Sequence, residues 1–496
     1  MTDLELVATT AADASRLWAV SPPHRRAQAL VAVAGALDAA QNELVALGVE
    51  ETGLSETRLT GELKRTTVQL KMFADIVVDG GYLDVRIDEA DPEFVLGARP
   101  DLRRYLRPLG PVLNFAASNF PFAFSIAGGD TAAALAAGCA VIVKGHPGHP
   151  RVSARTTQIV AAAVEKSGAP AGLVQLVMGQ EEGVGLLRHP RVAAGSFTGS
   201  TRVGRMLAEI AAARPAPIPF FGELGSVNPT FVTRTALDER GAEVADGFLA
   251  SVCASAGQLC TKPGLLFVPH HDGFAELIAS RVDDAEHRLL NPSIASGYDA
   301  RRSTILGTPG VEPIVEGSLR FDDEGQAWAT PTIVRVSSAD MVMRRETLVD
   351  EAFGPLSVIV EYDDEELLVD LADELFEGSL TGTIHAGSGE TSTAIRDLVD
   401  WIARHAGRVL FGGWPTGVAV TSAQQHGGPW PATTNDTGTS VGGAALSRFL
   451  RPVAYQSVPQ HLLPEPLRDD NPWQVPQRRS SAGESKSWGS AYCRRP

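Results

Sequence analysis

Apolar and polar residues follow different periods in successive parts of the chain, and each period predicts a different kind of element. Ala, Leu and Val recur at helical spacing over residues 25–47 and, after a glycine-bounded turn, over residues 61–77, so the N-terminal part is expected to be mainly helical. Residues 83–87 and 102–106 instead alternate apolar and polar positions, which predicts two exposed antiparallel strands. Such a pair is a candidate for pairing with another subunit.

Beyond Pro111, short apolar runs alternate with helical segments. Strands are expected at 111–116, 140–143, 173–178, 192–197 and 218–221, and helices up to 137, over 153–167, up to 187 and over 202–213. Continuous apolar strands that alternate with helices predict a parallel sheet covered on both faces. Ligands bind at the carboxyl ends of the strands in such sheets, so residues that follow the strands are the candidates for a site.

A second α/β segment is expected over residues 228–414. Its predicted helices lie at 245–256, 274–285 and 365–375, and its predicted strands at 265–268, 356–360 and 408–411. The chain thus divides into residues 1–82 with 107–227, residues 228–414, and a small β extension over 83–106 with part of 415–473. The polar segment 474–496 is expected to be a disordered tail.

Composition narrows the function classes. The formal net charge is −16, from 43 basic and 59 acidic residues, which disfavours nucleic acid as a partner. The N-terminal segment has no basic region followed by an apolar core, and charges or glycines interrupt the apolar stretches, so neither a secretory signal nor a membrane span is expected. The four cysteines form no CxxC pair, and reduced thiols in the cytoplasm are the simplest interpretation.

Three side chains are candidates for chemistry. Cys260 ends a stretch of small residues expected to be helical, 250–257, just before a strand; a buried core cysteine is the plain alternative, and a nucleophile would need a base and an oxyanion site. Glu223 lies between glycines at the end of an apolar strand, where a solvated turn residue is the alternative. Asn119 follows a strand and precedes a helix, as a helix cap or as an amide donor to an oxyanion.

Further residues are candidates for binding a phosphate-bearing cofactor. The string FTGSTRVG (197–204) joins the fourth strand to a helix and presents free backbone N–H groups at the helix N-terminus. Lys144 ends the second strand, where it is either a surface charge or a partner of a ribose or phosphate. Glu351 lies in a Gly-Pro loop, and His426 lies in a loop without an evident metal partner, so no zinc site is predicted.

Taken in order, these strings resemble the aldehyde dehydrogenase superfamily over residues 10 to 470. The matching strings are SNFP, VIVKGHP, FTGSTRVG, FGELGSVNP, GQLCTKPG, EAFGP and GGPWPATT. Within the superfamily, ETGL, RTTVQLKMFA and AGGDTAAALAAGCAVIVKGHPGHP are most similar to the often NADP-linked branch that holds 2,5-dioxovalerate (alpha-ketoglutarate semialdehyde) dehydrogenases and a fatty aldehyde dehydrogenase. The C-terminal tail departs from the family's usual ending.

The resemblance implies an α/β fold with a Rossmann-type cofactor domain (1–82 and 107–227), an α/β catalytic domain (228–414) and a β extension that bridges subunits in a homodimer or homotetramer. It implies that Cys260 attacks the aldehyde, that Asn119 and the Cys260 N–H hold the oxyanion, and that Glu223 activates water to hydrolyse the thioester. It places the cofactor on Lys144, His146, Gly199, Ser200, Gly204, Glu351 and Phe353.

Several alternatives remain open from the sequence. Pro147 stands where the family's Lys-x-x-Glu pattern has a glutamate that would repel a 2′-phosphate, which favours NADP over NAD. An acylating enzyme that uses coenzyme A would lack Glu223, and a non-catalytic scaffold would have lost Cys260, Glu223 or Asn119. The substrate is expected to be alpha-ketoglutarate semialdehyde, with a fatty or other aliphatic aldehyde as the alternative.

Overall fold

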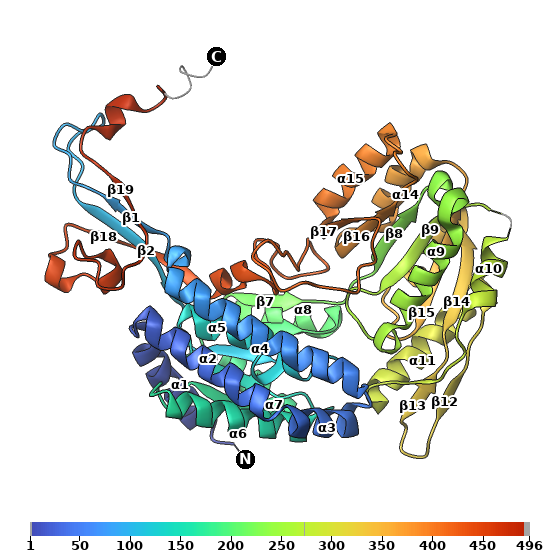
Figure 1. The fold of residues 1–496 in the computed structure, drawn as a ribbon, viewed down its shortest axis with the longest axis horizontal. Helices are drawn as coiled ribbons and strands as arrows, with labels where there is room; N and C mark the ends of the chain where they lie inside the picture. The colour runs from blue at the N-terminus through green and yellow to red at the C-terminus, as the bar shows by residue number, and fades with distance from the viewer. Residues whose placement is uncertain (1, 272, 491–496) are drawn as a thin grey trace.

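The computed structural model describes residues 2–271 and 273–490 and contains two mainly parallel sheets and a projecting β arm (Figure 1). The first sheet has five parallel strands in the order β5-β4-β3-β6-β7. These strands are β3 (Val112–Phe115), β4 (Val141–Lys144), β5 (Val174–Val177), β6 (Ala194–Thr198) and β7 (Phe220–Glu223). The residues of β3, β4, β6 and β7 are buried along most of each strand, as expected for strands covered on both faces.

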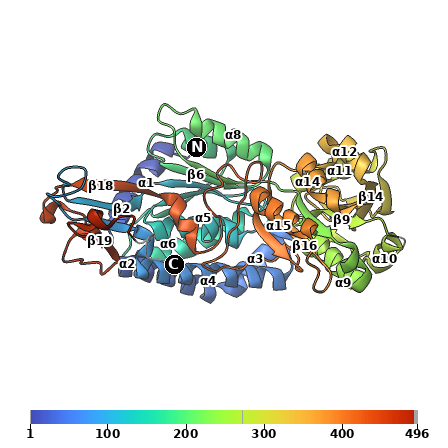
Figure 2. The ribbon, with the colours of Figure 1, turned by 90° about the horizontal axis from the view of Figure 1, so that it is seen from above.

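Helices cover both faces of this sheet, and Figure 2 shows α4 and α8 on opposite sides of it. They are α1 (Leu4–Ala19), α2 (Pro23–Ala39), α3 (Gln41–Thr52), α4 (Glu56–Asp79), α5 (Gly129–Ala137), α6 (Pro150–Lys166), α7 (Gln180–Arg188) and α8 (Thr201–Ala212). The alternation of strands and helices predicted from Pro111 onward is therefore confirmed. The carboxyl ends of β3, β6 and β7 bring Asn119, the Gly199 turn and Glu223 to one edge of the sheet.

The second sheet has seven strands in the order β11-β14-β15-β9-β8-β16-β17. Only the edge strand β11 is antiparallel to its neighbour. The strands are β8 (Asn228–Val232), β9 (Pro263–Pro269), β11 (Glu312–Val315), β14 (Thr332–Ser337), β15 (Leu356–Tyr362), β16 (Ser379–His385) and β17 (Ala406–Phe411). A three-stranded sheet stands beside it, made of β10 (His287–Arg288), β12 (Leu319–Phe321) and β13 (Ala327–Ala329).

A separate hydrophobic core lies on each face of the second sheet. Phe248 and Ile278 belong to one core, and Tyr298 and Trp401 belong to the other. The helices of this part are α9 (Arg234–Cys253), α10 (Phe274–Arg281), α11 (Pro292–Leu306), α12 (Ser338–Met343), α13 (Arg345–Leu348), α14 (Leu368–Leu375) and α15 (Thr393–His405). The sequence pattern had suggested only three of these helices and three of these strands.

The projecting arm is a four-stranded sheet in the order β18-β2-β1-β19, drawn at the upper left of Figure 1. The two strands expected at 83–87 and 102–106 are β1 (Val85–Asp88) and β2 (Leu102–Pro108), and they pair antiparallel as predicted. β18 (Leu450–Gln456) pairs antiparallel with β2.

The prediction of a disordered tail over 474–496 is wrong for its described part. β19 (Gln477–Ser480) pairs parallel with β1, and a helical turn follows over Glu484–Ser487. Arg478 and Arg479 are polar but need only backbone pairing to join an exposed edge, so composition alone gave no sign of this strand. The rest of the predicted tail, including Cys493, lies outside the described residues.

Three helix predictions are corrected. The single helix expected over 25–47 is two helices that meet at Ala40, and the one expected to begin near Gly61 begins at Glu56, because Ser55 accepts a hydrogen bond from Arg58 N and caps it. The helix expected between Asn119 and Ala137 is interrupted: residues Phe122–Ile126 form a turn with non-helical backbone before α5 begins at Gly129.

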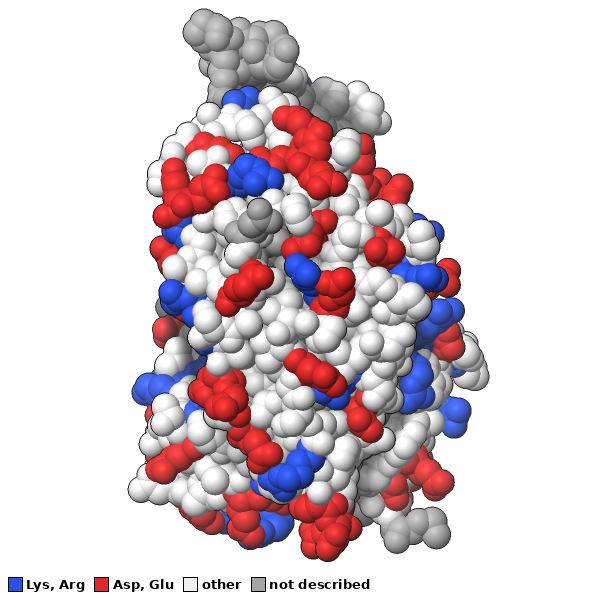
Figure 3. Space-filling view, turned by 90° about the vertical axis from the view of Figure 1, so that its right-hand side faces the viewer, with Lys and Arg blue, Asp and Glu red and all other residues white. Residues whose placement is uncertain are grey.

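Among the described residues, no single helix is long and apolar enough to cross a membrane, although α2 and α3, bent by 69° at their junction, meet the length and composition criteria together. On the end of the molecule formed by the second sheet, acidic and basic side chains are interspersed without a continuous basic area (Figure 3).

Candidate active site

Glu223 is held at the last position of β7, where the second sheet and a C-terminal segment meet the first sheet. Its backbone forms an antiparallel bridge with Thr433, and Leu224 N donates to Ala432 O at 2.8 Å. The string GGPWPATT is therefore joined to the end of β7, and the Glu223 side chain is buried beneath it.

His426 lies between Glu223 and Cys260, although both are far from it in sequence. Its Nε2 is 2.9 Å from Glu223 Oε1 and 3.7 Å from Cys260 Sγ. Ser440 donates to the other carboxylate oxygen, and His426 Nδ1 is buried with no hydrogen-bond partner among the described residues. Both Glu223 oxygens are thus engaged, and one imidazole nitrogen faces the base and the sulfur together.

The segment before Cys260 has an unusual backbone. Ser255, Ala256 and Gly257 have positive φ values of 50°, 57° and 66°, which residues other than glycine rarely adopt. The predicted helix over 250–257 is therefore wrong in its last turns, since α9 ends at Cys253. A Cβ at Gly257 would lie 2.1 Å from Gly354 O, so this glycine lets the EAFGP loop approach the cysteine loop.

Buried amides fix the cysteine loop from two sides. Asn228 Nδ2 donates to the carbonyls of Cys260 at 2.8 Å and Lys262 at 2.9 Å. Asn119 Nδ2 donates to Gln258 O at 3.0 Å. An amide nitrogen carries two protons, so Asn119 keeps a second donor beside Gln258, two residues before Cys260 in the same loop, and its role at an oxyanion site stays a prediction.

The pKa values of the carboxyl and the thiol move in opposite directions. Burial alone would raise the pKa of Glu223, but the charge and hydrogen bonds of His426 and the hydrogen bonds of Ser440 and Cys260 lower it to about 2. Burial, and then the negative charge of Glu223, raise the pKa of the Cys260 thiol well above its usual range. The resting site therefore holds a carboxylate beside a protonated thiol.

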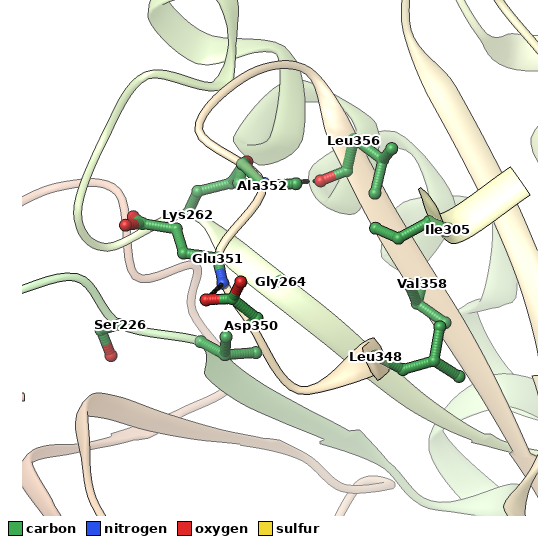
Figure 4. A pocket seen from close by; sticks show the side chains of 11 residues that line it. Ser226, Lys262, Gly264, Ile305, Leu348, Asp350, Glu351, Ala352, Leu356 and Val358 are labelled. Carbon is green, nitrogen blue, oxygen red and sulfur yellow. Dashed lines mark hydrogen bonds between the residues drawn. The ribbon is translucent and has the colours of Figure 1, made fainter. Parts of the chain in front are cut away.

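A second group of buried side chains adjoins the cysteine loop and lines a small cavity (Figure 4). Lys262 Nζ donates to Ala352 O at 2.7 Å and to Leu356 O at 2.5 Å, so it fastens the loop that carries Glu351. Burial raises the pKa of Glu351 to about 7, against the opposing charge of Lys262, and burial lowers the pKa of Lys262 to about 8. A Cβ at Gly225 would lie 2.5 Å from Glu351 Oε2 and 3.4 Å from Thr201 Oγ1, which places the carboxylate beside the start of α8.

The turn between β6 and α8 is open to a phosphate. Ser200 caps α8 but makes no side-chain capping bond, and Gly199 and Ser200 are exposed. Gly204 faces the interior of the protein and not the solvent side of the turn, because a Cβ at this position would lie 2.1 Å from Leu224 Cδ2. Gly204 is therefore required for close packing of α8 against the end of β7. Gly199 N donates to Glu223 O at 3.0 Å, which ties the turn to the end of β7, so the exposed residues that remain for a phosphate are Ser200 and the first turn of α8.

The other residues assigned to the cofactor lie around the same sheet edge. Burial lowers the pKa of the half-buried Lys144 ammonium, and no acidic group within the described chain offsets that effect. Burial, His149 and Lys144 lower the pKa of His146 to about 3, and its Nδ1 accepts from Gly148 N at 3.0 Å. Phe353 packs against the core of the first sheet. An exposed helix N-terminus and a lysine without a counterion, both at the carboxyl end of the same sheet, fit a phosphate-bearing dinucleotide.

Sequence reasoning missed the position of His426. The ligand atoms of Cys260, Glu223 and His426 lie within 4.8 Å of one another, a set of ligand types that zinc also uses. The sequence gives His426 no evident partner, because the residues that it contacts are more than 160 positions away in the chain. Ser440, the second partner of Glu223, was not considered, and neither its type nor its sequence neighbours point to a buried carboxylate.

Comparisons with known proteins show which family the chain resembles. A family profile described as Aldehyde dehydrogenase family matches residues 1–429. The chain is 40% identical over 455 residues to the alpha-ketoglutaric semialdehyde dehydrogenase of Acinetobacter baylyi, covering 91% of this chain and 86% of that protein. It is 42% identical over 472 residues to alpha-ketoglutaric semialdehyde dehydrogenase 2 of Azospirillum brasilense, covering 92% and 89%.

Solved structures share the fold at lower sequence identity. A 3,6-anhydro-L-galactose dehydrogenase in complex with NAP superposes with a TM-score of 0.77 at 22% identity, covering 91% of each chain. A 1-pyrroline-5-carboxylate dehydrogenase from Thermus with bound NAD gives a TM-score of 0.74 at 22% identity, covering 91% of this chain and 85% of that one. The predicted fold is thereby confirmed.

Proposed function

The chain belongs to the aldehyde dehydrogenase family and is an oxidoreductase that acts on small aldehydes, and we propose that it oxidises alpha-ketoglutarate semialdehyde (2,5-dioxopentanoate) to 2-oxoglutarate with NADP. The observation that carries the reaction is the contact of Cys260, His426 and Glu223 in one buried group. The substrate rests on the two relatives at about 40% identity that carry this activity in their names.

In the first step, Cys260 Sγ attacks the aldehyde carbon. The thiol is protonated at rest, since burial and Glu223 raise its pKa, so its proton leaves toward the Glu223 carboxylate as the carbon–sulfur bond forms. His426 contacts both groups and keeps them at this separation. The oxygen that becomes negatively charged is stabilised by the free Asn119 amide proton and the Cys260 N–H; one such donor is worth about 2.7–4 kcal/mol of barrier.

The second step releases the product as an acid. When bound, a nicotinamide dinucleotide supplies the acceptor for the hydrogen and electron pair that leave the aldehyde carbon. Glu223 first releases to solvent the proton that it took from the thiol. It then takes a proton from water, whose oxygen attacks the thioester carbon, and it gives that proton to the Cys260 sulfur as the carbon–sulfur bond breaks. General-base catalysis of this kind contributes roughly 10²–10⁴-fold. A carboxylate at this position supports water, rather than coenzyme A, as the acceptor of the acyl group.

Lys144 supports NADP as the preferred cofactor. It stands at the end of β4 without an acidic partner in the described chain, and the residue three positions later is Pro147 rather than a glutamate. A 2′-phosphate would therefore meet a positive charge and no carboxylate at that position. Gly199, Ser200 and Glu351 would hold the pyrophosphate and the nicotinamide ribose, with Phe353 packed beside them.

Two open sheet edges support a homodimer or homotetramer. β18 is the outer strand of the arm and β17 is the outer strand of the second sheet, and Phe411 on β17 is 61% exposed. Exposed edges of this kind pair readily with another chain. Light scattering on the purified protein would give the number of subunits.

The test of this function is the reduction of NADP and NAD by the purified protein with alpha-ketoglutarate semialdehyde, succinic semialdehyde and pentanal. Preference for the keto-semialdehyde with NADP is expected. Preference for the aliphatic aldehyde would instead favour a fatty or general aldehyde dehydrogenase. Cys260→Ala should abolish oxidation while NADP still binds, and substantial remaining turnover would remove Cys260 from its role as nucleophile.

A further inference from the structure

A pair of arginines on α4 faces the segment that carries Asn119. Arg58, Glu62 and Arg65 follow one another at helical spacing, so they share one face of the helix. Arg58 lies 4.5 Å over the ring of Phe120, and Arg65 lies 5.2 Å over the ring of Phe124. The two rings contact each other edge to face, with centroids 5.2 Å apart.

Arg58 has a complete set of partners. It donates to Glu62 Oε2 at 2.6 Å, to Ser255 Oγ at 3.1 Å and to Asn119 O at 3.2 Å. Glu62 is also saturated, because its other oxygen accepts from the N–H groups of Phe122 and Ala123. This pair therefore holds together α4, the Asn119 segment and the cysteine loop.

Arg65 differs from its neighbour in having no anion to bind. Its Nη1 is buried and forms no hydrogen bond with any described residue, and Glu62, the nearest carboxylate on its helix, is fully occupied. A buried donor without a partner is costly. Burial lowers the pKa of Arg65, and the charges of Glu62 and Glu223 oppose that effect. The guanidinium thus lies within electrostatic range of Glu223 and of the Cys260 sulfur.

The surroundings of Arg65 are otherwise apolar. Phe124 packs in a cluster with Ala117, Ala123 and Val441, against which Phe120, Val418 and Val420 are also packed. An uncharged aldehyde would need only apolar side chains of this kind around its chain. A guanidinium with a buried, unpaired nitrogen among these side chains instead fits a ligand whose far end is negatively charged.

We propose that Arg65 is the binding site for the carboxylate of an aldehyde-acid substrate, held with its aldehyde carbon at Cys260. This inference rests on the proposed function and names the group that selects the substrate. The guanidinium presents two parallel donors to a carboxylate, while Phe120 and Phe124 contact the chain between the two ends. Arg65 acts in binding and takes no part in the transfer of protons.

The test compares Arg65→Met and Arg65→Lys with wild type on two aldehydes of equal length, 2,5-dioxopentanoate and pentanal. For Arg65→Met we expect KM for the anionic aldehyde to rise about 10- to 100-fold, the range for a charge-assisted hydrogen bond, with kcat and the values for pentanal within threefold. Arg65→Lys keeps the charge and should fall between. Lys64→Met, which removes an exposed charge from the same helix, should change neither aldehyde.

Equal losses on both aldehydes, or no loss on the anionic one, would overturn the proposal. Turnover of pentanal shows that each variant is folded. A separate measurement distinguishes this inference from the proposed function: 2-oxoglutarate should inhibit pentanal oxidation by wild type and by Lys64→Met, but about 10-fold more weakly in Arg65→Met. That difference would support the carboxylate site even if the wild-type enzyme preferred another aldehyde-acid, and equal inhibition would overturn it.

Discussion

At the scale of single residues, the site depends on a proton that three side chains can exchange. The sequence alone makes Cys260, Glu223 and Asn119 candidates for this site, because each lies in a distinctive string beside a strand or glycine turn. It could not show that His426 and Ser440 hold Glu223, since both contacts bridge more than 200 residues. Contacts between a C-terminal loop and a distant strand leave no periodic pattern in the sequence.

The thiol of Cys260 should become more acidic when Glu223 loses its charge. The carboxylate opposes formation of a nearby thiolate and so contributes, after burial, to the raised pKa of the thiol. In Glu223→Gln, the midpoint of the pH dependence of alkylation by iodoacetamide should therefore move to lower pH, although steady-state turnover falls because thioester hydrolysis slows. Glu223→Asp keeps the charge and should retain the higher midpoint. An unchanged midpoint in Glu223→Gln would show that the two groups do not interact.

Removal of His426 should move the acid limb of the pH profile upward. His426 is one of the groups that lower the pKa of Glu223 to about 2, so in His426→Ala that pKa should rise toward and above its usual value, since burial then acts with less opposition. The base would be lost to protonation at a higher pH than in wild type, so kcat should fall in the acid range. Below the shifted pKa of Glu223, the loss should approach the roughly 10²–10⁴-fold contribution of general-base catalysis. Ser440→Ala keeps the imidazole contact and should show a smaller upward shift; identical profiles for His426→Ala and wild type would contradict the assignment.

At the scale of elements, the predictable parts of the chain are those with a clear period. The strands and helices of the first sheet follow from apolar runs and helical spacing, because this sheet is buried on both faces. The second sheet and the small sheet beside it were only partly predicted: their edge strands β11 and β12 are largely exposed and only a few residues long. The left-handed run at Ser255–Gly257 was assigned to a helix because its small residues favour one, while tertiary contacts with Arg58 and Gly354 fix another backbone.

Lys262 is expected to hold the Glu351 loop in place for the cofactor. Lys262 lies two residues after Cys260. Its ammonium donates to the carbonyl of Ala352 in that loop and to the carbonyl of Leu356 at the start of β15. Lys262→Met should free the loop, so that KM for NADP rises about 10-fold or more while covalent labelling of Cys260 persists. Ser357→Ala, which removes a hydroxyl bonded to Pro263 O and Gly264 O, tests whether any loss of packing near β9 has the same effect. A similar rise in both variants would mean that Lys262 has no specific part in holding the loop.

At the scale of the whole molecule, the C-terminal segment completes the arm. Val475 and Leu467 pack with Leu83, Val85 and Ile87 in a core of their own, and β19 covers the edge of β1. Arg103 strengthens this unit from within, because its guanidinium donates to Leu467 O and to the carboxylates of Asp101 and Asp469. The arm is therefore a small folded unit with a sheet and a core separate from the first and the second sheet.

Deletion of residues 475–496 should destabilise the arm but leave the active site intact. The deletion removes the buried Val475 side chain, worth about 1.5–3 kcal/mol, and exposes the edge of β1 to pairing with other chains. We expect a lower melting temperature and a change in the size distribution by light scattering, while kcat of the folded fraction stays within about threefold, because Cys260 and Glu223 lie outside the arm. Deletion of residues 482–496 keeps β19 and should leave both measurements close to wild type. Equal effects of the two deletions would show that β19 does not stabilise the arm, whereas loss of kcat in the longer deletion alone would mean that assembly through the arm is needed for catalysis.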